Sequence, residues 1–221
     1  SRADSPGSYQ TSSANRPVPD RELDFPPMAI QAPPAVEVRQ KLTPADVDRM
    51  LREGLLDPDQ GCELVDGELI EVCPTLSGHG KVCIRISSKL QQFVEKRGGW
   101  LFDSSTGFKV GPNRRNLRSP DVSYIGPGRP EPPDDEFVDG APDLAVEVLS
   151  EGQHGQAYAM PKVREYFEAG AQLVWLVDMK RREVRVYRPD ADEYTVLRAE
   201  ASLTLEPIVS GFTLRVSDIF G

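Results

Sequence analysis

The stretch “DLAVEVLS” at residues 143–150 decides the fold, because its apolar run predicts a buried strand. One position in the middle of this strand, Glu147, is an acid. An isolated ionised carboxylate in an apolar interior costs several kcal/mol, so Glu147 must be paired, hydrogen-bonded or bound to a metal. We interpret Glu147 as half of a metal site.

The segments around this strand alternate between helical and strand patterns. In “KLTPADVDRMLREG”, Thr43 is the predicted N-cap of a helix, Pro44 its first residue and Gly54 its stop. The dipeptide Asp66–Gly67 predicts a hairpin turn within residues 62–72. Further patterns predict helices at 79–97 and 157–171, strands at 100–110, 119–126 and 172–178, a solvent-edge hairpin at 183–189 and 193–199, and a closing segment at 211–220. This order predicts an α/β fold with a mixed β-sheet core flanked by helices, with additional β-hairpins.

The chain divides into a tail and one domain. Residues 1–35 are rich in Ser, Pro and Ala and lack periodicity, so we predict a disordered tail there. The folded domain is expected at 36–221. A chain of 221 residues with 38% hydrophobic content is long enough for one domain with a sizeable core and marginal for two.

Composition excludes several classes of protein. A net charge of −9 argues against a protein that coats nucleic acid non-specifically, but it allows an enzyme with a local basic lip around an acidic site. The sequence contains no run of about 18 apolar residues, so no membrane span is predicted. No signal peptide is expected at the start. Three cysteines, at 62, 73 and 83, form no CxxC motif and predict reduced thiols in a cytoplasmic protein. A disulfide between Cys62 and Cys73 across the hairpin is the less favoured alternative.

A second acid accompanies Glu147. Asp121 follows Pro120 at the start of the strand predicted at 119–126. If the two strands are neighbours, the carboxylates of Asp121 and Glu147 can converge on a hard cation such as Mg²⁺, and the backbone carbonyl of Val148 can supply another oxygen. A cation there would lower the pKa of a bound water and stabilise charge on a phosphate.

The arrangement of “PD” followed by a strand Glu resembles the PD-(D/E)xK nuclease superfamily. More closely, residues 36–220 resemble the Uma-two family of restriction-endonuclease-like proteins. The matching stretches are “CELVDGELIEV”, “SGHGKV”, “SPDVSYI”, “PDLAVEVLS”, “KVREYFEAGAQLVWLVD” and “VYRP”. The resemblance implies a restriction-endonuclease-like core and a Mg²⁺- or Mn²⁺-dependent endonuclease that hydrolyses DNA. Such folds often act as dimers, so a homodimer is a further expectation.

Carried onto this chain, the resemblance makes Asp121 and Glu147 metal ligands and catalytic residues. The superfamily usually has a Lys two residues after the Glu, where this chain has Leu149. We expect Lys162, on the following helix, to supply the basic group. The weaker substitutes are Lys109, Gln153 and His154.

Three accessory residues are also candidates. His79, between two glycines at a predicted helix start, is either a loop histidine or a phosphate or water contact, because helix N-termini favour anions. Glu63 and Glu68 flank the hairpin turn and are either solvated or, by the Uma-two resemblance, an extra site carboxylate. The arginines at 114, 115 and 118 form either a solvated loop or a grip on a phosphate backbone.

Two other functions stay open. Glu147 and Lys162 could form a structural ion pair in a non-catalytic binding or scaffold protein that keeps the nuclease fold, which the acidic charge and Leu149 favour. A sugar- or nucleotide-processing hydrolase with two carboxylates and no metal is the third alternative. Trp175, in “LVWLVD”, is expected in the core without a functional role.

Overall fold

The computed structural model describes residues 41–149, 156–191 and 193–221, and the predicted tail and the predicted domain start at Val36 lie outside these ranges. The helices are α1 (Pro44–Arg52), α2 (Ser77–Arg97), α3 (Gln156–Glu168) and α4 (Val216–Phe220), with one 3-10 turn, η1 (Pro112–Arg114). The strands are β1 (Cys62–Val65), β2 (Glu68–Glu71), β3 (Trp100–Asp103), β4 (Phe108–Val110), β5 (Asn116–Arg118), β6 (Val122–Ile125), β7 (Val138–Asp139), β8 (Leu144–Leu149), β9 (Leu173–Asp178), β10 (Glu183–Tyr187), β11 (Thr195–Arg198), β12 (Ser202–Leu203) and β13 (Leu214–Arg215).

The largest sheet has six strands in the order β11-β10-β9-β8-β6-β3, and the apolar run Leu144–Leu149 forms its strand β8. β8 and β9 run parallel, while the other neighbours pair antiparallel. A parallel pair needs a crossover connection, and α3 supplies it between β8 and β9. The predicted α/β fold with a mixed sheet is therefore confirmed.

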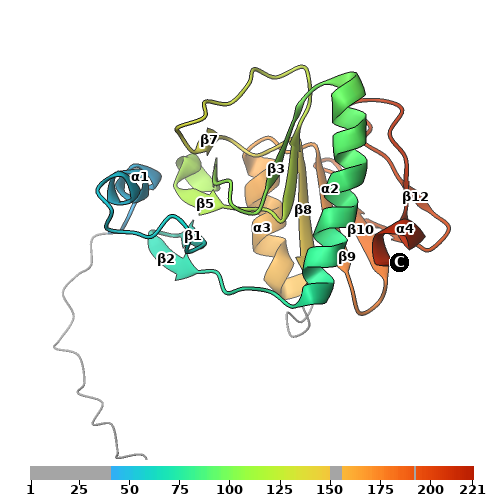
Figure 1. The fold of residues 1–221 in the computed structure, drawn as a ribbon, viewed down its shortest axis with the longest axis horizontal. Coiled ribbons are helices and arrows are strands. Elements are labelled where there is room, and N and C mark those ends of the chain that lie inside the picture. The colour runs from blue at the N-terminus through green and yellow to red at the C-terminus, as the bar shows by residue number, and fades with distance from the viewer. Residues whose placement is uncertain (1–40, 150–155, 192) are drawn as a thin grey trace, which may run out of the picture. The chain divides into compact units, whose positions relative to one another are not determined.

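Alternation along β8 directs its side chains into two cores. One face packs against α2, in a core that includes Leu144, Val146, Val148, Val82, Ile86 and Leu90. The other face packs against α3, in a core that includes Ala145, Leu149, Ala159, Val163 and Tyr166. Figure 1 shows α2 and α3 on either side of β8. Glu147 lies between Ala145 and Leu149 in sequence and therefore faces α3.

A second sheet has five strands in the order β2-β1-β5-β4-β7, and it also packs against α3. Phe108 and Val110 of β4 share the core of Val163 and Tyr166 of α3. The other face of this sheet packs against α1, in a small core that includes Val47, Leu64 and Leu117. Because α3 contacts both sheets, side chains of β1 and β5 can meet side chains of β8 on its surface.

Local signals placed the helix ends well. The Thr43 side chain accepts a hydrogen bond from the Asp46 backbone N–H, and the Asp46 carboxylate accepts one from the Thr43 N–H, which completes a capping box before Pro44. Gly98 ends α2 with a φ of 83°, in a left-handed conformation that glycine adopts without strain. Helix α2 begins at Ser77, two residues before the predicted start.

Two strand predictions were wrong in detail. Residues 100–110 form two strands in different sheets, because Asp103 Oδ1 accepts hydrogen bonds from the Ser105 backbone N–H and hydroxyl and closes a turn between them. The hairpin at 183–199 is a solvent edge only along β11. Strand β10 is buried along its whole length, because it pairs with β9 on one side and β11 on the other.

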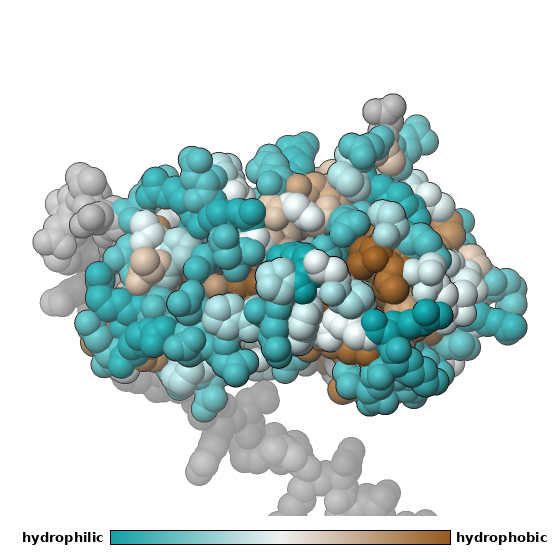
Figure 2. Space-filling model, turned by 90° about the horizontal axis from the view of Figure 1, so that it is seen from above, coloured by the Kyte–Doolittle hydropathy of each residue, from teal (hydrophilic) through white to brown (hydrophobic). Residues whose placement is uncertain are grey.

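The surface carries few large apolar areas on the side drawn in Figure 2, which is mostly hydrophilic with small hydrophobic areas between the polar ones. None of the helices in the described ranges combines the length and the apolar character that crossing a membrane requires. Cys62, Cys73 and Cys83 are free, so the disulfide considered between Cys62 and Cys73 is absent.

Candidate active site

Strands β6 and β8 position the two predicted acids. They are neighbours, with Val122 opposite Val146, so continuing this register by one residue brings Asp121 opposite Glu147. The Val148 backbone N–H donates a hydrogen bond of 2.6 Å to Asp121 Oδ2. The Asp121 carboxylate is therefore held by the backbone of β8 at Val148, the residue after Glu147.

Helix α3 supplies the partners of Glu147. Lys162 Nζ lies 3.0 Å from Glu147 Oε2, and the Tyr166 hydroxyl donates a hydrogen bond of 2.5 Å to Glu147 Oε1. Burial raises the pKa of the Glu147 carboxyl, and the negative charges of Asp121 and Glu63 add to this increase against the opposing effect of Lys162. The ionised form of Glu147 is thus held in a surrounding that disfavours it.

The second sheet adds a carboxylate and a guanidinium. Glu63 Oε1 on β1 lies 3.0 Å from Lys162 Nζ, and Arg118 on β5 contacts Glu63 Oε2 at 2.8 Å and Glu165 Oε2 at 2.6 Å. Burial alone would raise the pKa of Glu63, but the charges of Lys162 and Arg118 outweigh burial and lower it. We call Glu63, Arg118, Glu147, Lys162, Glu165 and Tyr166 the central cluster.

The charge of Lys162 is stabilised where it lies. Burial alone would lower the pKa of its ammonium, but the carboxylates of Glu147 and Glu63 outweigh burial and raise the pKa above its usual value. Only 12% of the Lys162 side chain is exposed, so the ammonium is screened little by solvent. The predicted meeting of Lys162 and Glu147 is present in the structure.

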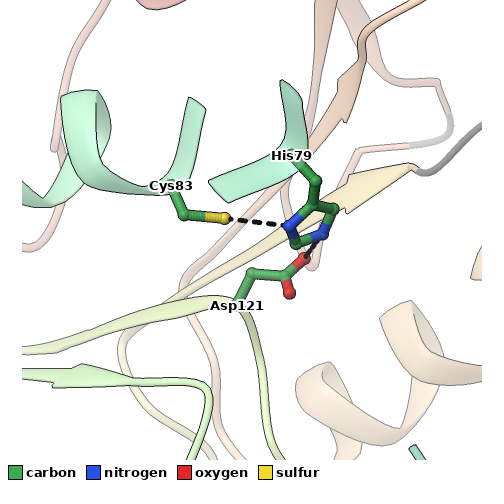
Figure 3. Close-up of side chains that lie close together, drawn as sticks. All are labelled: His79, Cys83 and Asp121. Carbon is green, nitrogen blue, oxygen red and sulfur yellow. Dashed lines mark hydrogen bonds and ion pairs between the residues drawn. The ribbon is translucent and has the colours of Figure 1, made fainter. Parts of the chain in front are cut away.

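His79 completes the surroundings of Asp121. It lies in the first turn of α2, and its Nε2 donates to Asp121 Oδ2 at 3.2 Å, while its Nδ1 lies 3.4 Å from Cys83 Sγ. Figure 3 shows the ring between the thiol and the carboxylate. The hydrogen bond to Asp121 raises the pKa of His79 to about 10, so the ring is an imidazolium at neutral pH.

Other candidates lie elsewhere. Glu68 is exposed on β2, opposite Val65 rather than beside Glu63, and within the described residues it has no hydrogen bond to the central cluster. Lys109 lines a separate cavity of about 470 Å³ beside α1. Gln153 and His154 fall outside the described residues.

The arginines interpreted as a solvated loop or a grip on a phosphate backbone behave differently from one another. Arg118 is only 6% exposed and is held by two carboxylates, so its expected place in a solvated loop is wrong. Arg114 donates to the backbone carbonyl of Ala169, and Arg115 is exposed. The sequence pattern placed all three in one loop, but β5 turns Arg118 inward.

Sequence reasoning missed three residues of the site. Tyr166 lies four residues after Lys162 and Cys83 four residues after His79, so the helical spacing that places side chains on one face could have found both. Glu165 carried no comparable signal, because its partner Arg118 is 47 residues away in sequence.

The oxygens of Asp121, Glu147 and Val148 are of the type that a hard divalent cation prefers. Asp121 uses Oδ2 for both of its contacts, so Oδ1 remains for a further ligand. The N–H and C=O of one strand residue point to the same side, so the Val148 carbonyl faces the edge where Asp121 lies. Carboxylate and carbonyl oxygens are the ligands Mg²⁺ prefers. A different set, His79, Cys83 and Asp121, has donor atoms that all lie within 4.8 Å of one another among the described residues.

Comparison with known proteins supplies a family and a fold. A crystal structure described as a “putative nuclease belonging to DUF820” from Anabaena variabilis matches with a TM-score of 0.66 and 21% identity, covering 81% of this chain and 97% of the other. At that identity the likeness shows the fold. No curated protein matches the chain. The model of the Uma2 (Uma-two) family, described as “Putative restriction endonuclease”, matches residues 45–217, and the chain therefore belongs to the Uma2 family.

Proposed function

We propose that this protein is a divalent-metal-dependent endonuclease that hydrolyses phosphodiester bonds in DNA. Membership of the Uma2 family and the likeness to a fold described for a nuclease support the class of reaction. The observation that carries the proposal is the 3.0 Å contact between Lys162 Nζ and Glu147 Oε2. It gives the site the ammonium that Leu149 cannot supply.

Asp121, Glu147 and the Val148 carbonyl would hold Mg²⁺ or Mn²⁺, which when bound supplies a water of lowered pKa and a positive charge beside the phosphate. Lys162 keeps its proton next to two carboxylates and can direct its ammonium toward a phosphate oxygen or the attacking water. The Tyr166 hydroxyl fixes the orientation of Glu147, and His79 fixes that of Asp121. Glu63 forms a second ion pair with Lys162 and helps to hold its ammonium in place.

A cleavage assay tests this proposal. Plasmid DNA, single-stranded DNA and RNA are incubated with Mn²⁺ and either the parent protein or Glu147→Gln. We expect the parent to cleave DNA, and Glu147→Gln to lose at least about hundredfold in rate. The matched control is Glu168→Gln, which changes an exposed carboxylate on the same helix and should cleave as the parent does. Equal cleavage by parent and Glu147→Gln would refute the site.

One observation favours a second function, a non-catalytic binding protein that keeps the fold. The carboxylates of Glu63 and Glu147 are already paired with Lys162 and Arg118, as expected of a structural ion network. Isothermal titration with Mn²⁺ separates the two. Binding that disappears in Asp121→Ala and Glu147→Ala supports the enzyme, whereas a parent protein that neither binds Mn²⁺ nor cleaves supports the scaffold. Cleavage that resists EDTA would instead favour a metal-free hydrolase.

DNA as the substrate, a homodimer and a cytoplasmic location remain predictions of this proposal. Substrate choice follows from the three nucleic acids of the cleavage assay. The oligomeric state follows from sedimentation of the parent protein, in which a single species of monomer mass would contradict the dimer.

A further inference from the structure

The cluster of His79, Cys83 and Asp121 contains a thiol for which the proposed nuclease reaction has no use. His79 and Cys83 lie four residues apart on α2, so both side chains project from the same helical face. Asp121 approaches from the start of β6, and all three meet in Figure 3. The donors come from two elements that are each fixed by packing.

The spacing of these donors suits a metal ion. Two ligands four residues apart on a helix form a natural chelate. Zinc bonds of about 2.3 Å to sulfur and about 2.0–2.1 Å to nitrogen, at a tetrahedral angle, put the two atoms roughly 3.6 Å apart. Cys83 Sγ and His79 Nδ1 are 3.4 Å apart. Coordination there requires almost no movement of the pair, and it displaces the proton of His79 Nδ1 and that of the Cys83 thiol to water.

Asp121 fits the same ion in either of two places around it. Its carboxylate oxygen lies within 4.8 Å of the other two donor atoms, so a rotation of the carboxylate away from His79 Nε2 would make it a third ligand. Before that rotation it accepts the hydrogen bond of His79 Nε2, the contact that orients a metal-binding imidazole in many proteins. Cys83 is only half-buried and 18% of the Asp121 side chain is exposed, so water can reach the remaining position.

The donor types select the kind of cation. Thiolate and imidazole prefer Zn²⁺ and similar transition metals, whereas Mg²⁺ prefers oxygen. We propose that Cys83, His79 and Asp121 bind a thiophilic divalent cation such as Zn²⁺. This cation then inhibits the nuclease, because Asp121 is also a ligand of the proposed Mg²⁺ site. The inhibition rests on the proposed function; the binding does not.

Binding is tested with Co²⁺ as the probe, because a Co²⁺–thiolate bond gives a charge-transfer absorption that oxygen ligands lack. We expect the parent protein to show this band, and Cys83→Ser to lose it. Cys62→Ser and Cys73→Ser are matched controls that should keep it, since both residues lie outside the cluster. A parent without the band, or a band that survives in Cys83→Ser, overturns the proposal.

Alkylation of the parent protein gives the same answer without any variant, in case Cys83→Ser fails to fold. Zn²⁺ should slow the reaction of Cys83 with iodoacetamide, while exposed Cys73 serves as the internal reference and reacts at an unchanged rate. Equal rates at Cys83 with and without Zn²⁺ overturn the proposal.

The inhibition is measured as the Zn²⁺ concentration that halves Mn²⁺-supported cleavage, with each variant normalised to its own rate without Zn²⁺. Loss of a metal contact costs at least about tenfold in affinity, so Cys83→Ser should need at least about tenfold more Zn²⁺. An unchanged concentration overturns the inhibitory role. If the parent does not cleave at all, the nuclease proposal fails, and the Co²⁺ result still decides whether the thiophilic site exists.

Discussion

Two clusters of charged side chains in this protein each contain buried carboxylates, such as Glu63 in one and Asp178 in the other. The central cluster joins β1, β5, β8 and α3 through ion pairs such as Lys162–Glu63, whose residues are 99 positions apart. A second set, which we call the hairpin cluster, lies on β9, β10, β11 and the turn between β9 and β10, and comprises Asp178, Arg181, Glu183, Arg185 and Arg198. Its partners are 2–15 positions apart. Strand alternation directs Asp178 to the same face of the large sheet as Glu147, because two residues before it Leu176 belongs to the core packed on α3.

Glu147 in the central cluster and Asp178 in the hairpin cluster have pKa values shifted in opposite directions. Burial alone would raise the pKa of Asp178, but hydrogen bonds from the Arg181 backbone and side chain outweigh burial and lower it. The pKa of Glu147 is raised, because its burial and two nearby acids outweigh Lys162. A structural ion pair stabilises its charges, whereas a carboxyl group whose surroundings disfavour the charged form is a candidate functional group. By this criterion the central cluster, which contains Glu147, is the better candidate for a functional site.

The largest expected effect is on stability, from Arg118→Met. Removing this guanidinium leaves Glu63 and Glu165 buried with less compensation, so the free energy of unfolding should fall by about 3–5 kcal/mol. Urea denaturation measures the loss. In the hairpin cluster, Arg181 is 62% exposed, and Arg181→Met should lower the stability much less than Arg118→Met does. Equal small losses in both variants would mean that the central cluster is no more tightly coupled than the hairpin cluster.

The next effect is on cleavage, from Lys162→Met. Losing the ammonium beside Glu147 should lower the Mn²⁺-supported rate by about 10²–10³-fold per folded molecule. Arg185→Met removes an equally buried cation from the hairpin cluster and should keep the rate, although it also destabilises the fold. Circular dichroism gives the folded fraction of each variant. Similar rate losses in both would remove the functional distinction between the clusters.

A smaller effect is expected from Tyr166→Phe. The variant keeps the ring and removes the hydroxyl that donates to Glu147, and a hydrogen bond to a charged group contributes about 1.5–3 kcal/mol. Stability should fall by that amount and cleavage by several-fold, because Glu147 loses its orientation. Tyr124→Phe is the control: its hydroxyl donates to the Gly98 carbonyl, away from both clusters, so cleavage should not change. A cleavage loss in Tyr124→Phe as large as in Tyr166→Phe would argue for a general packing effect.

The smallest effect is a difference in the sign of pH dependence, measured by urea denaturation with a chelator present. A raised folded-state pKa at Glu147 means that its contribution to stability is present below the ordinary value of 4.5 and is lost as the pH rises. A lowered pKa at Asp178 means that its contribution is present above 3.8 and is lost as the pH falls through the folded-state pKa. Glu147→Gln should therefore flatten the decline above pH 4.5, and Asp178→Asn the decline on the acid side. The opposite assignment of the two slopes would contradict the comparison.

Sequence patterns located the acids better than their partners. Glu147 was singled out because a charge interrupts an apolar strand, and Asp121 because it starts a neighbouring one; both meet the same edge of β8. Lys162 was found only as a substitute for the missing Lys at 149. Arg118 was misinterpreted, since a run of arginines in a loop gives no sign of which member the following strand turns inward.

The sequence by itself determined the elements and the family: the buried strand at 144–149, the capped helix after Thr43 and the Uma2 motifs all depend on local patterns. Only the tertiary structure decided that Lys162 lies between Glu147 and Glu63, and that Cys83 joins His79 and Asp121. The physical reason is that periodicity specifies which face of an element is buried, whereas packing α3 between two sheets specifies which buried faces meet. That packing, and no local sequence pattern, pairs charged groups that are far apart in sequence.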